Sequence, residues 1–192
     1  KRLDDRQRRQ RFFAGQPGRT WDGRLVAVAA NIAIADEAAA AFASGAEAIG
    51  LFRTEMLFVD REQAPGEDEQ FEAYRRAVAS GAGRPVIIRT LDVGGDKPLG
   101  YLRLPREDNP FLGYRAVRIY REFEAVFRAQ VRALLRASVF GRLRVMVPLV
   151  SRVEEAAWTR TVVREEQARL SGEGIACDPS MELGGLIEVP SA

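Results

Sequence analysis

Short apolar segments alternate with longer amphipathic segments along most of the chain, beginning near residue 20. The apolar segments predict five β-strands, and helical spacing of apolar residues predicts four helices between them. Buried parallel strands connected by covering helices produce this pattern. We therefore predict an α/β fold with a parallel sheet that is either doubly wound or curled into a barrel. The predicted strands span residues 26–32, 48–52, 85–88, 143–149 and 183–187.

Start and stop signals bound the predicted helices. Asp36 can cap an alanine-rich helix, and Gly45 can end it in the left-handed conformation. Ser151 and Glu154 have the spacing of a capping box for a helix that runs to about Leu170. The other two helices have apolar faces, formed by Gln70, Phe71, Tyr74, Ala77 and Val78 before a stop at Gly81, and by Phe123, Phe127, Val131, Leu134 and Leu135 before a stop near Ser138.

The length of the chain bounds its domain organisation. Its 192 residues are 46% hydrophobic, which is enough for one sizeable core. We predict that residues 1–20, which begin with a strongly basic run, are a linker or a solvated helix, and that residues 21–192 form the domain. Because a complete (β/α)8 barrel needs about 250 residues, we expect only a partial barrel, lacking about three strands.

Composition excludes several kinds of chemistry. The chain has no histidine, which rules out catalysis by imidazole and metal sites with histidine ligands within it. Its single cysteine, Cys177, cannot form an internal disulfide, and we expect it to have no catalytic role. No segment is apolar enough to cross a membrane, and the charged N-terminus does not resemble a secretory signal, so we predict a cytoplasmic protein that binds neither membrane nor nucleic acid.

Charged residues follow three of the predicted strands. Arg53 ends the second, Arg89 follows the third, and Glu188 follows the fifth. Binding groups gather at the carboxyl ends of parallel strands, where paired guanidinium groups suit a small phosphorylated acid and a carboxylate can hold Mg²⁺. A structural network of ion pairs at the rim of the sheet is the alternative.

The segment of residues 92–97, DVGGDK, follows the third strand. Its two glycines allow the backbone to approach an anion closely, and Lys97 adds charge, although a tight turn explains the glycines equally well. Lysine occurs only at Lys1 and Lys97 among 29 basic residues, so the remainder are arginine. The spacing is not that of a Walker A loop.

Four strings in the chain are distinctive. They are GAEAIGLFRTEMLF (45–58), RPVIIRTLDVGGDKPLGYL (84–102), NPFLGYRAVRI (109–119) and LRVMVPLVS (143–151). Together they closely resemble the family of enzyme I, the phosphoenolpyruvate-protein phosphotransferase of the bacterial sugar phosphotransferase system. The resemblance covers residues from about 20 to 192, and the combination of RTLD with VGGDK sets it apart from pyruvate phosphate dikinase and phosphoenolpyruvate synthase.

The resemblance implies a phosphoenolpyruvate-binding barrel of which this chain is the first part. Arg53 and Arg89 match phosphate-binding arginines of the family, Arg115 matches a third, catalytic arginine, and Glu188 matches one of two carboxylates that bind Mg²⁺. Val189 departs from the family pattern, which has threonine after this glutamate. The second carboxylate, a further arginine and the family's active-site cysteine are expected beyond residue 192.

The family's reaction transfers phosphate from phosphoenolpyruvate to a histidine on a separate swivelling domain, and then to the carrier protein HPr. The resemblance therefore implies that this chain supplies a clamp for the phosphate and has no turnover alone. It also implies a homodimer. Two alternatives remain open, which are a binding or dimerisation module without catalysis and a stand-alone lyase of the related barrel superfamily.

Overall fold

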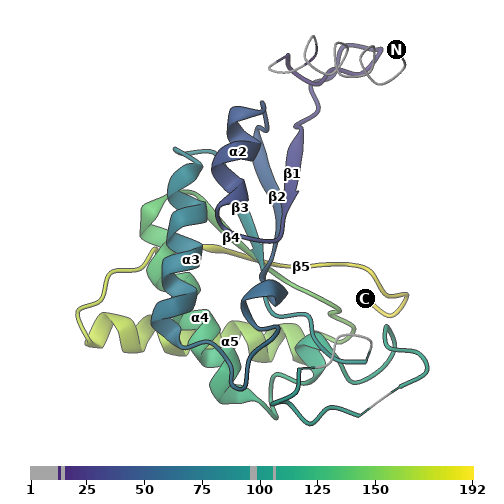
Figure 1. Cartoon of the computed structure of the whole chain (residues 1–192), viewed down its shortest axis with the longest axis vertical. Coiled ribbons are helices and arrows are strands. Elements are labelled where there is room, and N and C mark those ends of the chain that lie inside the picture. The colour runs from purple at the N-terminus through teal and green to yellow at the C-terminus, as the bar shows by residue number, and fades with distance from the viewer. Residues whose placement is uncertain (1–12, 14–15, 96–98, 106) are drawn as a thin grey trace.

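A computed structural model describes residues 13, 16–95, 99–105 and 107–192 of the chain, so most of the predicted linker at residues 1–20 lies outside the described residues. The described part is an α/β fold with one five-stranded sheet (Figure 1). All neighbouring strands are parallel and follow the order β1-β2-β3-β4-β5. The strands are β1 (Ala29–Ile32), β2 (Ala48–Arg53), β3 (Val86–Arg89), β4 (Leu143–Val147) and β5 (Glu182–Gly185).

All five predicted strands exist; β2 and β3 agree with the prediction to within one residue at each end, and the other three differ by more. Strand β1 begins at Ala29 rather than at residue 26, because the Val26 N–H bonds to the Gly18 carbonyl instead of a neighbouring strand. Strand β4 stops before Leu149, whose left-handed backbone (φ 54°) cannot continue a strand. Strand β5 begins and ends earlier than predicted, and Ile187 beyond it is 72% exposed.

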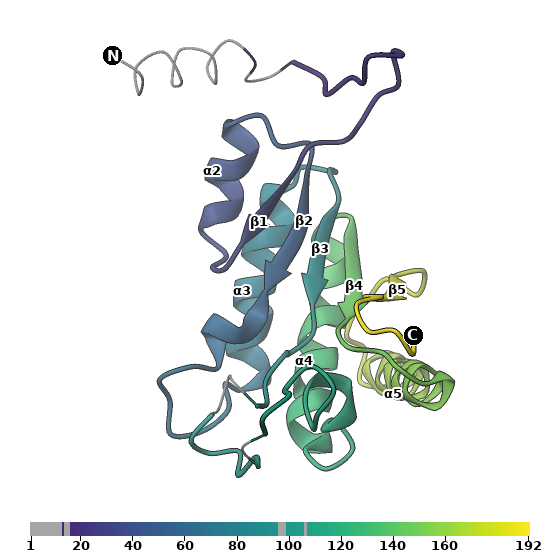
Figure 2. The ribbon, with the colours of Figure 1, turned by 90° about the vertical axis from the view of Figure 1, so that its right-hand side faces the viewer.

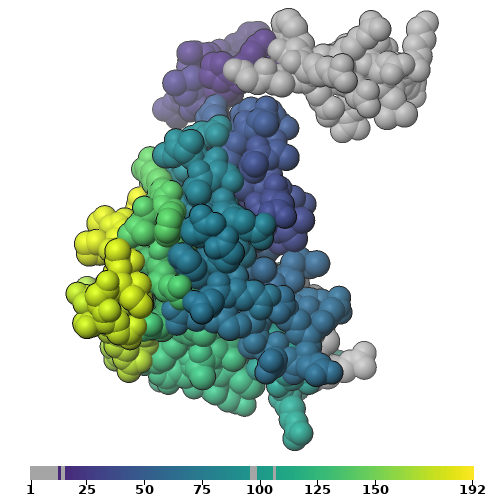
Figure 3. Space-filling view, turned by 60° about the vertical axis from the view of Figure 1, so that its left-hand side comes forward, coloured from purple at the N-terminus to yellow at the C-terminus, as the bar shows by residue number. Residues whose placement is uncertain are grey.

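Four α-helices pack beside the strands, as the sequence predicts. Helix α3 contacts both α2 and α4, and α4 contacts α5, so the helices form a layer in chain order (Figures 2 and 3). Tyr74 of α3 and Phe127 of α4 belong to the core between this layer and the sheet. The helices are α2 (Glu37–Ala43), α3 (Glu67–Ser80), α4 (Glu124–Ala137) and α5 (Val153–Gly172), with short 3-10 turns η1 (Thr54–Leu57), η2 (Ala116–Arg118) and η3 (Ser138–Phe140).

The strand order bears on the choice between the two predicted architectures. A doubly wound sheet reverses its strand order at a switch point, which places helices on both faces. The five described strands show no such reversal, and their helices follow one another in a single layer. Within the described residues, no helix is long and apolar enough to cross a membrane.

Two predicted helix caps differ in the structure. Asp36 occupies the cap position of α2, but its carboxylate makes no capping bond and pairs with Arg76 at 2.6 Å. The predicted box of Ser151 with Glu154 is wrong by one residue. Glu155 accepts hydrogen bonds from the N–H groups of Ser151 and Arg152 at 2.8 and 3.0 Å, because Arg152 is the residue that precedes α5. The left-handed Gly45 after α2 is confirmed (φ 99°).

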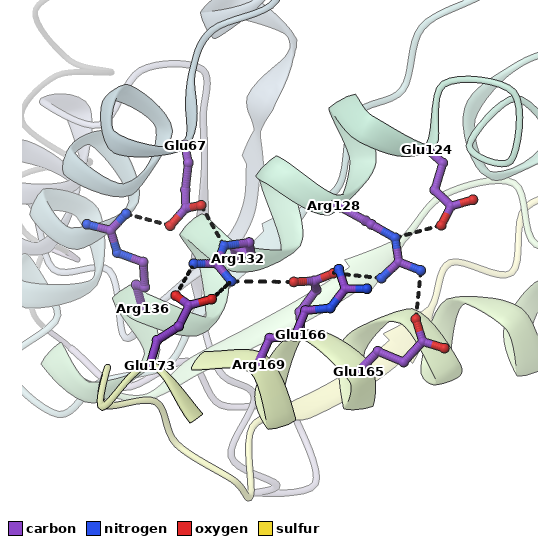
Figure 4. Close-up of polar contacts among 9 residues, drawn as sticks. All are labelled: Glu67, Glu124, Arg128, Arg132, Arg136, Glu165, Glu166, Arg169 and Glu173. Carbon is purple, nitrogen blue, oxygen red and sulfur yellow. Dashed lines mark hydrogen bonds and ion pairs between the residues drawn. The ribbon is translucent and has the colours of Figure 1, made fainter. Parts of the chain in front are cut away.

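Ion pairs connect α3, α4 and α5 on the outer side of the helix layer (Figure 4). Three arginines spaced four residues apart on α4 face carboxylates of the neighbouring helices. Glu166 is the most buried member, with its side chain 1% exposed, and it accepts from Arg128 at 2.6 Å and from Arg169 at 2.8 Å. We call this set the helix-layer network; it comprises Glu67, Asp68, Glu124, Arg128, Arg132, Arg136, Glu165, Glu166, Arg169 and Glu173.

Candidate functional site

Arg53 and Arg89 lie side by side at the carboxyl end of the sheet. Each is the last residue of its strand, and the two are partners in the register between β2 and β3. Arg53 is exposed, whereas Arg89 is buried. No hydrogen bond or ion pair to another described residue holds the Arg53 side chain, so its guanidinium is available to a ligand.

Arg89 belongs to a buried cluster of four charged residues that also contains Arg115. Arg89 donates to Glu55 and lies 3.2 Å from an oxygen of Asp92. Arg115 binds Asp92 with two parallel bonds, from Nε at 2.6 Å and from Nη2 at 3.0 Å. Each of the four side chains is at most 10% exposed. We call this set the strand-end cluster.

The two glycines after β3 bring Arg115 into this cluster. Gly94 has φ +131°, and a Cβ on it would lie 2.8 Å from the Arg115 Cα. Gly95 has φ +57°, and its Cβ would lie 2.3 Å from Pro110. The close approach that the sequence predicts is thus made to the chain's own segment 110–115. Lys97 of the same segment lies outside the described residues.

Glu188 lies beyond β5 and contacts the end of β4. Its Oε1 accepts a hydrogen bond from the Leu149 N–H at 3.0 Å. Its neighbour Val189 packs with Leu149 and with Ala116, the residue after Arg115. The surroundings of Arg115 and Glu188 are therefore joined by one small apolar cluster.

The backbone of this apolar cluster is strained. Ala116 and Leu149 both have left-handed conformations, with φ of 53° and 54°. Such conformations are unfavourable for residues other than glycine and are frequently found at functional sites. The strain therefore favours a functional role for the start of η2, next to Arg115, and for the segment after β4.

We tested whether these residues fit Mg²⁺. Glu188 is exposed and uses one oxygen for Leu149, so its carboxylate retains acceptor capacity for a cation. The described part of the chain contains no group of three histidine, cysteine or acidic residues placed to hold a metal. Glu188 therefore fits as one ligand of Mg²⁺, which usually takes only one or two protein carboxylates.

A chain of buried, uncharged polar side chains reaches the strand ends from the helix layer. Gln130 of α4 accepts from the Leu91 N–H at 2.9 Å and donates to Thr54 at 3.3 Å and to Tyr74 at 3.0 Å. Burial raises the pKa of Tyr74, and this effect is larger than the opposing effect of the hydrogen bond from Gln130. Burial likewise raises the pKa of Tyr120, whose hydroxyl lies 2.7 Å from the Leu91 carbonyl.

The sequence analysis singled out Arg53, Arg89 and Arg115 as candidates, and their role stays a prediction; it missed several of the partners that the structure gives Arg89 and Arg115. Glu55 and Asp92 received no role, although each lies two or three residues after an arginine that ends a strand. Gln130 was also missed. It follows Phe127 by three residues and precedes Leu134 by four, so helical spacing places it on the buried face of α4. A glutamine on such a face is a signal of a buried polar contact.

Cys177 lies away from this arrangement, in the segment that leads into the amino end of β5. Burial raises the pKa of its thiol, which opposes formation of a nucleophilic thiolate. That this cysteine has no catalytic role stays a prediction.

These observations define a class of protein: an α/β protein with a parallel sheet that presents buried and exposed arginines, beside a carboxylate, at its carboxyl edge. Comparison with known families then identifies the chain further. Residues 7–192 match the family described as "PEP-utilising enzyme, PEP-binding domain", and the chain belongs to this family.

Several named proteins are similar to the chain. It is 50% identical over 182 residues to Multiphosphoryl transfer protein 2 of Escherichia coli, which covers 95% of the chain and 22% of that protein. It is 47% identical over 173 residues to the phosphoenolpyruvate-protein phosphotransferase of Geobacillus stearothermophilus, and 48% identical over 172 residues to that of Staphylococcus carnosus. These two matches each cover 90% of the chain and 30% of the relative, so the chain spans less than a third of these relatives.

Proposed function

We propose that the chain is the phosphoenolpyruvate-binding part of an enzyme I type phosphotransferase and forms the first five strands of a (β/α)8 barrel. The sequential strand order, with one layer of helices, supports the barrel. Membership of the PEP-binding family supports the substrate. The observation that carries the proposal is the pairing of Arg53 with Arg89 at adjacent strand ends, next to Arg115.

In this proposal each arginine has a distinct part. Arg53, which is exposed, contacts the phosphate of phosphoenolpyruvate first. Arg89 and Arg115 are held by Glu55 and Asp92, so their guanidinium groups present a fixed positive charge with little reorganisation. A transferring phosphoryl group spreads negative charge over its oxygens, and such a clamp stabilises that charge.

Glu188 is proposed as one carboxylate ligand of Mg²⁺. The cation, when bound, neutralises charge on phosphate oxygens. Glu188 is fixed for this task by the Leu149 N–H, which holds one carboxylate oxygen.

The chain contains no histidine that could accept the phosphoryl group. We therefore propose that a histidine on another domain accepts it and that HPr receives it next, with this chain alone lacking turnover. The name of the Geobacillus stearothermophilus relative, phosphoenolpyruvate-protein phosphotransferase, supports transfer of the phosphoryl group to a protein. The homodimer, the cytoplasmic location and the expected linker at residues 1–20 stay predictions.

Titration calorimetry of the chain with phosphoenolpyruvate, with and without Mg²⁺, tests the proposal. We expect weak binding that Arg53→Ala reduces by about tenfold or more, because this change removes a charge-assisted contact. Arg164 is an exposed arginine on α5 whose side chain makes no hydrogen bond or ion pair with another described residue. Arg164→Ala is therefore the matched control and should bind as the unchanged chain does. Equal loss in both variants, or no binding by the unchanged chain, would contradict the proposal.

A further inference from the structure

We propose that Gln130 is a positioning residue that fixes the strand ends bearing Arg53 and Arg89 at the spacing needed to bind phosphate. The identity of the ligand in this inference rests on the proposed function. The role of Gln130 rests on the hydrogen bonds of its buried side chain. Gln130 is 1% exposed and lies in the middle of α4, which ends at Ala137 and contributes none of the site's charged residues.

The amide of Gln130 makes three hydrogen bonds, two of them to residues at different strand ends. Its oxygen accepts from the N–H of Leu91, two residues after β3, at 2.9 Å. Its nitrogen donates to the hydroxyl of Thr54, the residue after β2, at 3.3 Å. Thr54 in turn donates to the carbonyl of Arg89 at 3.0 Å. One side chain therefore connects the residue next to Arg53 with the backbone on both sides of Thr90.

The network permits only one orientation of this amide. Tyr74 donates to Gln70 at 3.1 Å, and Thr54 donates to Arg89, so both hydroxyls offer Gln130 an acceptor rather than a proton. Rotating the amide by half a turn would set its NH₂ group against the Leu91 N–H. The donors and acceptors around Gln130 therefore fix the orientation of its amide.

The strand ends need this support because their backbone leaves the sheet while still buried. The Thr90 N–H bonds to the carbonyl of Met146 in β4, but the next N–H, that of Leu91, has turned toward the helix layer. Leu91 is 4% exposed, so water does not readily replace the glutamine. An unpaired buried N–H is unfavourable, and its segment would shift to find another partner.

A shift of this segment would move the clamp itself. Arg89 lies two residues before Leu91, and Asp92, which holds Arg115, directly follows it. A displacement of about 1 Å in a positioning group can lower binding or rate by up to about a hundredfold. Gln130 therefore acts on the ligand through the strand ends and does not touch it.

Gln130→Met tests the inference, because methionine has a similar length and cannot make these bonds. We expect faster hydrogen exchange at the Leu91 amide and a loss of about tenfold in affinity for phosphoenolpyruvate. Tyr74→Phe is the matched control. It removes the hydroxyl that accepts from Gln130 and donates to Gln70 but leaves the bonds of Gln130 to Leu91 and Thr54, so affinity should stay within about twofold at a similar loss of stability.

A second pair of variants keeps the test decisive if Gln130→Met does not fold. Thr54→Val removes the link to the Arg89 carbonyl at nearly constant shape, whereas Thr54→Ser retains the hydroxyl. We expect the valine variant to bind weakly and the serine variant to bind normally. Affinity that follows thermal stability in all four variants would overturn the inference.

The two proposals can fail separately. Absence of phosphoenolpyruvate binding by the unchanged chain would contradict the proposed function. Unchanged exchange at the Leu91 amide in Gln130→Met would overturn the positioning role of Gln130, whether or not the ligand binds.

Discussion

The chain contains two networks of arginines and carboxylates that are built from the same chemical groups and differ in their setting. In the strand-end cluster, every charged side chain is at most 10% exposed. In the helix-layer network, the α4 arginines are about one-fifth exposed, and most of their carboxylate partners are more exposed than that. The first stands where two strands end and the backbone nearby is strained, and the second joins regular helices (Figure 4).

This difference shows that the position of an ion pair in the fold says more about its function than the types of residue that form it. Arg128 and Arg132 each make at least three contacts with carboxylates, which serve to join α3, α4 and α5. Arg89 and Arg115 make their contacts beside Arg53, an exposed arginine to which no described side chain is bound. Only the strand-end cluster therefore combines fixed charge with a neighbouring group that is open to a ligand.

The largest effect on stability is expected at Asp92. Asp92→Asn keeps the shape of the side chain and removes the negative charge that faces Arg89 and Arg115. Removing one partner of a buried ion pair leaves a buried charge uncompensated, so we expect the free energy of unfolding to fall by about 3 kcal/mol. Urea denaturation followed by circular dichroism measures this change.

The control for Asp92 is an exposed pair. Glu182 lies 3.0 Å from Arg144, and its side chain is 61% exposed. Glu182→Gln should lower the free energy of unfolding by less than about 1 kcal/mol. Equal losses in the two variants would show that burial does not distinguish the strand-end cluster.

A smaller effect is expected at Glu166, the buried carboxylate of the helix-layer network. Glu166→Gln should lower the free energy of unfolding by about 2 kcal/mol, below the usual cost of breaking a buried pair, because Arg128 keeps other carboxylates. Affinity for phosphoenolpyruvate should not change. Glu165→Gln, at a side chain 46% exposed, should cost only about 0.5 kcal/mol in the same denaturation experiment. A change in affinity at Glu166 would remove the functional distinction between the networks.

The smallest effect on the free energy of unfolding is expected at high pH, from the buried tyrosines Tyr74 and Tyr120. Burial raises the pKa of Tyr74 and Tyr120 in the folded state, so the unfolded chain loses these protons first. Their contribution to stability is complete below the unfolded pKa of about 10 and is lost as the pH rises above it. Each tyrosine should then lower the free energy of unfolding by up to about 1.4 kcal/mol per pH unit.

Tyr74→Phe checks this assignment in urea denaturation between pH 9 and about 11. The variant should lose less stability across that range than the unchanged chain, because one of the two buried phenols is gone. An identical pH dependence in both proteins would contradict the assignment to Tyr74.

The general fold could be predicted from the sequence because its signals are local. The strands and helices follow from apolar runs and from glycines such as Gly45, and the positions of the arginines that end β2 and β3 follow from their place after such runs. Strand ends were less predictable, since Leu149 is apolar like the strand before it. Strand β4 ends at Pro148, which has no N–H for the sheet, and at the left-handed backbone of Leu149.

The partners within the site could not be predicted, because they come from segments far apart in the sequence. Asp92 and Arg115 are 23 residues apart, and Gln130 and Thr54 are 76 apart. Side-chain spacing shows which face of an element is buried, but it does not show which distant group that face meets. The glycines after β3 are a second example. Their sequence indicated a close approach of the backbone, but it did not show that Arg115 and Pro110 are the residues approached.

Arginine side-chain NMR during a titration with phosphoenolpyruvate tests the central claim most directly. With the Nε–H signals assigned by single substitutions, we predict that Arg53, Arg89 and Arg115 shift as ligand is added, while Arg128, Arg132 and Arg136 keep their positions. Shifts confined to the α4 arginines, or shifts of equal size in both groups, would contradict the claim that the strand-end arginines form the phosphoenolpyruvate site.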